Sequence, residues 1–297
     1  MKKLFLLGAA AVIFATGCEE TPPVINFHGT PGFVDTTYTE ASIPAAQAHN
    51  ILFEEFTGAT CPNCPAAHDL LKTIQDAHPG RINVVGLYPQ NVSQNKPPAG
   101  AKYDFRSMDA QNILDEVMKG MQGEPSAGID RLELSSVASA KIALLSSDWT
   151  SNIDPLLVTQ DTMNVDMTSS YDEGTGTATV IFKTTFLKNS TDQYNFTIAL
   201  LEDSLVDKQE RGSSIEDNYL FLNVCKAFVT SGMPFGQTLA PKLTAKPAGT
   251  VYMATYKYHV PSNVLNPKNC RLVGYVHRSQ PAGGTHVYQS VQCKLAP

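Results

Sequence analysis

The stretch from Phe53 to Pro65 reads FEEFTGATCPNCP, and it decides how the rest of the chain is interpreted. An apolar strand runs through a short turn into a Cys-X-X-Cys motif that opens a helix. A cysteine at the start of a helix faces unpaired backbone N–H groups and the positive end of the helix dipole, which favour the thiolate over the thiol. Cys61 is therefore the predicted nucleophile. Cys64 lies one helical turn further on, on the same face, and is the predicted resolving thiol.

This layout resembles a thioredoxin-like redox site, and two further residues match that resemblance. Glu55 stands six residues before Cys61, where thioredoxin-like domains carry a buried acid that accepts the proton of the resolving thiol. Pro125 precedes a strand-like segment and is the predicted cis-proline that packs against the disulfide in such domains. Its long separation from Cys64 is attributed to an insertion at about residues 90–120, which contains a Pro/Gly loop and an amphipathic helix.

The motif also has other interpretations. Cys61, Cys64 and His68 have a spacing that places three zinc ligands near one helical turn, but no fourth ligand is evident, so we expect no metal. Covalent haem requires His directly after the second cysteine, where Pro65 stands, and we expect no cofactor. A structural disulfide in a fold without a redox role is the serious competitor, because a short motif alone does not separate the two.

The N-terminus is typical of a bacterial lipoprotein signal, predicted to span residues 1–17. Lys2 and Lys3 precede an apolar run that is too short to span a bilayer and that ends in a small-residue cleavage site before Cys18. Cleavage there leaves Cys18 as the lipidated N-terminus, which carries palmitate or a similar chain. The acidic residues Glu19 and Glu20 do not resemble the usual inner-membrane retention signal. This favours the outer membrane, and the sequence does not indicate whether the protein faces the periplasm or the cell surface.

Export places the six cysteines in a compartment where disulfides persist. Cys270 and Cys293 sit at the two ends of an apparent hairpin, 271–278 and 285–292, so a cross-strand disulfide is a candidate if the register allows it. Cys225 is then a free thiol in a strand.

The charge balance excludes a nucleic-acid partner. The formal net charge is -6, and no cluster of Lys and Arg provides the basic surface that nucleic acids require. The expected partners are the thiols or disulfides of exported proteins, and the membrane through the N-terminal lipid.

Changes in pattern divide the chain. Residues 18–48 are rich in proline and predict a lipidated N-terminus and spacer. Residues 49–160 alternate strands with helices, which predicts an α/β thioredoxin-like domain. Residues 161–297 carry short period-two stretches separated by Gly, Pro and Asn, which predict an all-β immunoglobulin-like sandwich.

The chain resembles the lipoproteins related to the twenty-eight-kilodalton outer-membrane protein of Gram-negative anaerobes. The matching segments are Glu54–Gly58, Cys61–Pro65, Pro125–Arg131, Leu272–Val276, Val287–Gln289 and Lys294–Leu295. The resemblance implies a thioredoxin-like domain followed by a β-sandwich on an outer-membrane lipoprotein, and it implies no particular substrate. Asn63 replaces the proline of the thioredoxin motif and Pro65 follows Cys64, so redox direction does not carry over.

The predicted function is thiol–disulfide exchange on exported proteins, with roles for Cys61, Cys64, Glu55 and Pro125. The rival is a surface or periplasmic binding or assembly lipoprotein whose disulfide is structural.

Overall fold

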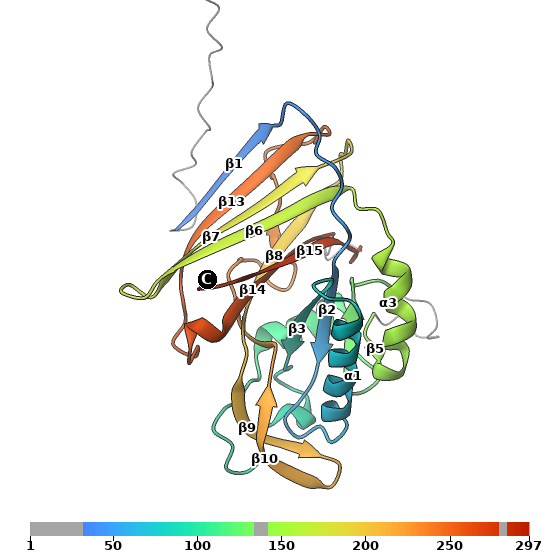
Figure 1. Cartoon of the computed structure of the whole chain (residues 1–297), viewed down its shortest axis with the longest axis vertical. Coiled ribbons are helices and arrows are strands. Elements are labelled where there is room, and N and C mark those ends of the chain that lie inside the picture. The colour runs from blue at the N-terminus through green and yellow to red at the C-terminus, as the bar shows by residue number, and fades with distance from the viewer. Residues whose placement is uncertain (1–31, 134–141, 279–283, 297) are drawn as a thin grey trace, which may run out of the picture.

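The computed structural model describes residues 32–133, 142–278 and 284–296, and within them the protein is mostly β-sheet with few helices (Figure 1). Three sheets hold the strands. The nine-stranded sheet has the order β15-β14-β8-β11-β3-β2-β4-β5, with β12 paired to β8, and the other sheets are β1-β13-β7-β6 and the hairpin β9–β10. The strands are β1 Phe33–Thr39, β2 Ile51–Phe56, β3 Ile82–Leu87, β4 Ser126–Ile129, β5 Leu144–Leu145, β6 Met163–Asp172, β7 Thr177–Phe186, β8 Asn195–Glu202, β9 Leu205–Arg211, β10 Ser214–Phe221, β11 Val224–Phe228, β12 Gln237–Thr238, β13 Thr250–His259, β14 Cys270–His277 and β15 Val287–Lys294.

The helices are short. Three are α-helices, α1 Cys64–Ala77, α2 Met108–Asn112 and α3 Trp149–Leu157, and η2 Ile113–Val117 continues α2 as a π-helix. Single 3-10 turns are η1 Ser93–Asn95, η3 Ser146–Asp148 and η4 Pro267–Asn269. Among the described helices none is both long and apolar enough to cross a membrane. The predicted signal, Cys18 and the spacer up to residue 31 lie outside the described residues, whereas the rest of the predicted spacer is described and contains β1.

The predicted strand–helix–strand unit around the motif is confirmed. β2 and β3 pair in parallel and α1 connects them. The helix begins at Cys64 rather than Pro62, with Pro65 in its first turn, where a missing N–H is harmless. Its buried residues Ala67, Leu71 and Ile74 recur at helical spacing and face the sheet.

The nine-stranded sheet is buried on both faces. Even-numbered residues of β2 such as Leu52 and Phe56 pack with α2 and η2, whereas odd-numbered Ile51 and Phe53 pack with α1 and α3. On that second face, at the other end of the sheet, Phe196 of β8 stacks on Phe182 of the four-stranded sheet. One face is thus covered by the short helices and the other partly by helices and partly by a second sheet.

The predicted domain boundary at residue 160 does not separate the sheets. β8, β11, β14 and β15 come from the later half of the chain, yet they extend the sheet that contains β2 to β5. The junction is β11 beside β3, where Val224 is paired with Gly86 and the Gly86 N–H donates to the Asn223 carbonyl at 2.8 Å. A Cβ on Gly86 would lie 2.8 Å from that carbonyl oxygen, so the contact requires glycine.

The predicted disulfide between Cys270 and Cys293 is wrong, because both are free thiols in the structure. The hairpin itself is confirmed, but its register pairs Cys293 with Leu272. The Leu295 N–H donates to the carbonyl of Cys270 at 3.0 Å, so the two cysteines are diagonal neighbours two residues out of step. Diagonal Cα atoms in a sheet are about 7–8 Å apart, which exceeds the usual span of a disulfide.

Candidate functional site

The two cysteines of the motif form a disulfide between the end of β2 and the start of α1. The bond joins Cys61 and Cys64, whose Cα atoms are 5.4 Å apart. Both residues are 0 % exposed. The sequence therefore identified the bonded pair, but not that both sulfurs are covered.

A loop at residues 93–95 holds one side of the motif. The backbone N–H and the hydroxyl of Thr60 both donate to the Gln94 carbonyl, each at 2.9 Å. Gly58 makes this approach possible, since a Cβ there would lie 2.1 Å from the Asn95 side-chain oxygen and 2.3 Å from the Gln94 carbonyl oxygen. The helical insertion predicted at about residues 90–120 thus begins with a segment that packs on the motif.

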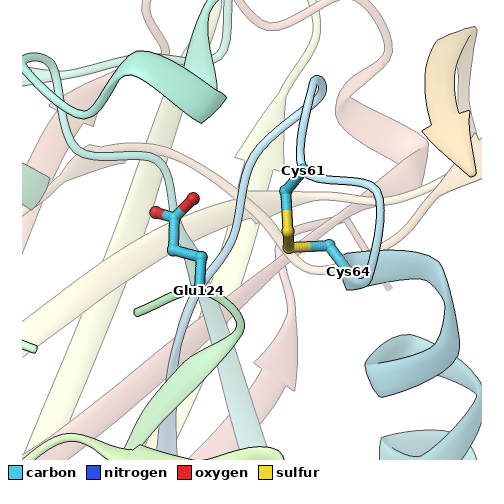
Figure 2. A group of neighbouring side chains, drawn as sticks. All are labelled: Cys61, Cys64 and Glu124. Carbon is cyan, nitrogen blue, oxygen red and sulfur yellow. A yellow bond between two sulfur atoms is a disulfide. The ribbon is translucent and has the colours of Figure 1, made fainter. Parts of the chain in front are cut away.

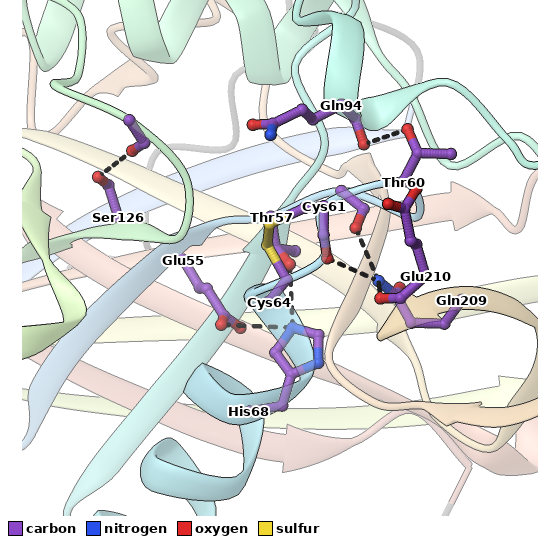
Figure 3. The surroundings of a disulfide bond; sticks show 12 residues. Glu55, Thr57, Thr60, Cys61, Cys64, His68, Gln94, Ser126, Gln209 and Glu210 are labelled. Carbon is purple, nitrogen blue, oxygen red and sulfur yellow. Dashed lines mark hydrogen bonds and ion pairs between the residues drawn. A yellow bond between two sulfur atoms is a disulfide. The ribbon is translucent and has the colours of Figure 1, made fainter. Parts of the chain in front are cut away.

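The β9–β10 hairpin holds the other side of the motif. Glu210 donates from its backbone N–H to the Ala59 carbonyl at 2.9 Å, and Gly212 to that of Pro62 at 3.0 Å. The Gln209 amide donates to the Gly58 and Cys61 carbonyls, both at 3.2 Å. Figure 3 shows Gln94 above the disulfide and Gln209 and Glu210 to the right of it. Sequence reasoning missed this hairpin.

Glu55 lies on the α1 face of β2, as its odd position requires. The residue is 2 % exposed, and its Oε1 has no hydrogen-bond partner among the described residues. His68 Nε2 of α1 is 3.4 Å from that oxygen, without hydrogen-bond geometry. Burial raises the pKa of Glu55 to about 8, because no charge compensates the carboxylate. The carboxyl therefore holds a proton at neutral pH.

His68 does not point to the cysteines. Its Nε2 is 2.9 Å from the Thr57 hydroxyl and its Nδ1 is 2.6 Å from the Tyr219 hydroxyl of β10 (Figure 3 shows the first contact). Burial lowers the pKa of His68 to about 4, so the ring is neutral at pH 7. With both ring nitrogens engaged, His68 is not available as the third metal ligand that its spacing suggested.

A cavity of about 420 Å³ lies between α1 and β10. Glu55, His68 and Tyr219 line it, together with Asp69 and Leu220. The buried carboxyl of Glu55 therefore borders a cavity whose walls are formed by side chains of α1 and of the β9–β10 hairpin.

A second carboxyl, Glu124, lies beside the disulfide and was missed by sequence reasoning. One of its oxygens and the Sγ atoms of Cys61 and Cys64 all lie within 4.8 Å of one another (Figure 2). Neither carboxylate oxygen has a hydrogen-bond partner among the described residues. Burial raises the pKa of Glu124 to about 7, and Asn95 offsets this only in part. The residue directly precedes Pro125, and the peptide bond between them is cis, as predicted for Pro125.

The other three cysteines of the described residues, Cys225, Cys270 and Cys293, lie in β11, β14 and β15. Burial raises the pKa of Cys270 to about 12 and that of Cys293 to about 11, and it raises the pKa of Cys225 still further. They behave as small apolar side chains rather than as reactive thiols.

The fold is shared with a solved structure, HBP35 of Porphyromonas gingivalis. The two chains are 15 % identical and superpose with a TM-score of 0.62 over 85 % of this chain and 77 % of that one. A domain of the outer membrane lipoprotein Omp28 from the same organism is 20 % identical, with a TM-score of 0.31 over 46 % of this chain and 90 % of that one. A search of curated proteins found no match.

The family model described as outer membrane protein Omp28 matches residues 114–296. The match covers more than half of the chain, including Glu124 and Pro125 but not Cys61 and Cys64. This protein therefore belongs to the Omp28 family and is localised to the outer membrane.

Proposed function

We propose that this protein carries out thiol–disulfide exchange on exported proteins, through a thioredoxin-like unit within residues 49–160. Cys61 is the nucleophile, Cys64 the resolving thiol and Glu55 a proton acceptor, and Pro125 shapes the groove for the substrate peptide. The observation that carries the proposal is a Cys-X-X-Cys disulfide at the start of a helix, with a buried carboxyl on the neighbouring strand that has no hydrogen-bond partner among the described residues.

The arrangement of elements supports this proposal. The parallel pair β2–β3 joined by α1 is extended by antiparallel β4 and β5, with α3 on the α1 face. The four-stranded sheet facing β8, β14 and β15 supports an immunoglobulin-like sandwich for the later half. A carboxyl with a pKa near 8 exchanges protons with thiols near neutral pH, because its pKa is close to theirs.

Exchange requires that the motif become accessible. The β9–β10 hairpin forms a sheet of its own, so it can move without breaking the strand pairing of the nine-stranded sheet. In the proposed cycle the hairpin moves away from the motif loop before a substrate thiolate attacks Cys61.

Cys18 is the proposed site of lipid attachment, which places this site on a membrane tether. Cys18→Ala should abolish lipid labelling and release the protein from membranes. Unchanged membrane fractionation of that variant would contradict the tether.

The proposed activity is tested by turnover of a peptide dithiol–disulfide pair, with Cys225→Ser as the matched cysteine control. Cys61→Ser should abolish turnover and Glu55→Gln should lower it by about 10²-fold or more, whereas Cys225→Ser should not change it. Glu55→Gln turnover within about threefold of the parent would refute the role of Glu55.

A second candidate function is favoured by one observation, the complete burial of both sulfurs. In that alternative the protein is a binding or assembly lipoprotein whose disulfide is structural. Equilibration with glutathione distinguishes the two, because structural disulfides have midpoint potentials below about -300 mV and resist reduction by the glutathione pool.

A further inference from the structure

Among the described residues, Glu124 is the carboxyl that has an oxygen within 4.8 Å of both motif sulfurs. Glu55 points to His68 and the cavity beside α1 (Figure 3), whereas Glu124 reaches the sulfur atoms from the loop before β4 (Figure 2). Glu55 belongs to β2 and Glu124 to the loop before β4, so the two carboxyls approach the site from different segments of the chain.

The carboxyl of Glu124 has no ion-pair partner and no hydrogen bond of normal geometry among the described residues. Its oxygens are buried and neither is hydrogen-bonded within the described chain, although a buried carboxylate without partners is costly. Glu54, one strand away, shows what a structural carboxyl looks like here, since Arg131 binds both of its oxygens. A buried carboxyl that has no cation or hydrogen bond of normal geometry, and that lies beside a disulfide, points to a chemical rather than a structural role.

We propose that Glu124 is a second proton carrier of the Cys61–Cys64 site, exchanging its proton directly with the sulfur that leaves as thiolate. This inference rests on the proposed exchange activity and deepens it. The burial that raises the pKa of Glu124 to about 7 gives it both protonation states near neutral pH, which a proton carrier needs.

The step balances as follows in the direction that oxidises a substrate dithiol. A substrate thiolate attacks Cys61 Sγ, the S–S bond breaks, and Cys64 Sγ leaves with the electron pair. The carboxyl of Glu124 gives its proton to that sulfur and becomes a carboxylate. The carboxylate then takes the proton of the second substrate thiol, whose sulfur attacks the mixed disulfide and releases Cys61 as a thiolate. The substrate loses two electrons and the cysteine pair gains them.

The same proximity predicts an electrostatic effect on the reduced protein. A carboxylate within 4.8 Å of a thiolate repels it, so Glu124 should raise the apparent pKa of the reduced motif cysteines. Glu124→Gln removes the charge and keeps the shape. It should lower the apparent pKa of Cys61 alkylation by at least about half a unit.

The test combines two measurements on Glu124→Gln, with the exposed carboxyl of η2 as a matched control in Glu116→Gln. All assays contain a chelator. We expect Glu124→Gln to slow exchange by about tenfold or more, and to remove an ionisation near pH 7 from the pH–rate profile. We also expect the apparent pKa of Cys61 alkylation to fall in Glu124→Gln. The control Glu116→Gln should match the parent in the pH–rate profile and in the alkylation pKa. Glu124→Asp, which withdraws the carboxyl by one methylene, should give an intermediate rate.

The outcomes separate this inference from the proposed activity. An active parent whose pH profile and alkylation pKa are both unchanged in Glu124→Gln would overturn the role of Glu124. A parent without turnover would refute the exchange activity and, with it, the transfer step. An alkylation pKa that still falls in Glu124→Gln would then show that only the electrostatic coupling survives.

Discussion

Two neighbouring acids of β2 show how differently the two faces of the central sheet treat a buried carboxyl. On the α2 face, Glu54 receives two hydrogen bonds from the Arg131 guanidinium, at 2.7 and 2.6 Å, and Tyr275 contacts both groups. On the α1 face, Glu55 has His68 3.4 Å away and no hydrogen-bond partner among the described residues. Both side chains are almost completely buried.

The difference separates a structural acid from a chemical one. A buried carboxylate with a bidentate guanidinium partner is a fixed contact, here between β2, the turn after β4 and β14. A buried carboxyl without a cation keeps its proton instead, and it is able to release that proton when a neighbour changes. Glu55, on the α1 face of the sheet, is a buried carboxyl without a cation.

The largest expected effect comes from breaking the pair on the α2 face. Glu54→Gln leaves the guanidinium of Arg131 buried without its counter-charge, and it should lower the free energy of unfolding by about 3–5 kcal/mol. Urea denaturation at pH 7 measures this. The double variant Glu54→Leu with Arg131→Met should recover most of the loss. A single-variant loss below about 1 kcal/mol would contradict the structural role.

Glu55→Gln should change stability in a pH-dependent way. The folded-state pKa of Glu55 is raised from 4.5 to about 8, so between these values the folded protein holds a proton that the unfolded chain has lost. The parent should therefore lose a few kcal/mol of stability as pH rises from about 4.5 to 8. The variant should lack this loss.

Urea denaturation at pH 5 and pH 8.5 tests the Glu55 prediction. The variant should match the parent at the lower pH and exceed it at the higher. Equal pH slopes for parent and variant would show that the buried carboxyl is ionised in the folded state.

A smaller effect is expected at the cysteines outside the motif. In the folded, reduced protein at pH 8, iodoacetamide should modify Cys61 well before Cys225, Cys270 or Cys293, because the helix N-terminus favours the Cys61 thiolate whereas burial raises the pKa of the other three. Mass spectrometry of tryptic peptides measures the order. If Cys270 or Cys293 were labelled before Cys61, the prediction that the motif cysteine is the more reactive one would be wrong.

The smallest effect is expected at an exposed ion pair of α1. Lys72 and Asp76 are 2.8 Å apart with both side chains largely in solvent. Lys72→Ala should lower the free energy of unfolding by less than about 0.5 kcal/mol, because water already screens the pair. A loss of unfolding free energy as large as that of Glu54→Gln would mean that burial does not determine how much an ion pair stabilises this protein.

Local patterns in the sequence predicted what depends on neighbours along the chain. The limits of β3, most of β2 and α1, the disulfide between Cys61 and Cys64, and the cis bond before Pro125 all follow from residues a few positions apart. The burial of Glu55 follows in the same way from its place on an apolar strand.

What sequence reasoning missed depends on long-range pairing. Gln209 contacts the motif from 148 residues away, and no local pattern indicates that contact. The alternation of buried Leu205, Asp207 and Gln209 before Gly212 is the signal that would have revealed the hairpin. The side chain of Glu124 is positioned by the backbone around Pro125, and the pairing of Cys293 with Leu272 by the register of β14 and β15, so residue types alone reveal neither.

The β9–β10 hairpin is synthesised long after the motif that it contacts. A chain emerges N-terminus first, so Cys61 reaches the envelope 148 residues ahead of Gln209. During that interval the motif loop lacks the hydrogen bonds that Gln209, Glu210 and Gly212 make to its carbonyls, and it gains them once residues 205–221 arrive. The part of the chain made last therefore completes the hydrogen bonding of a motif made much earlier.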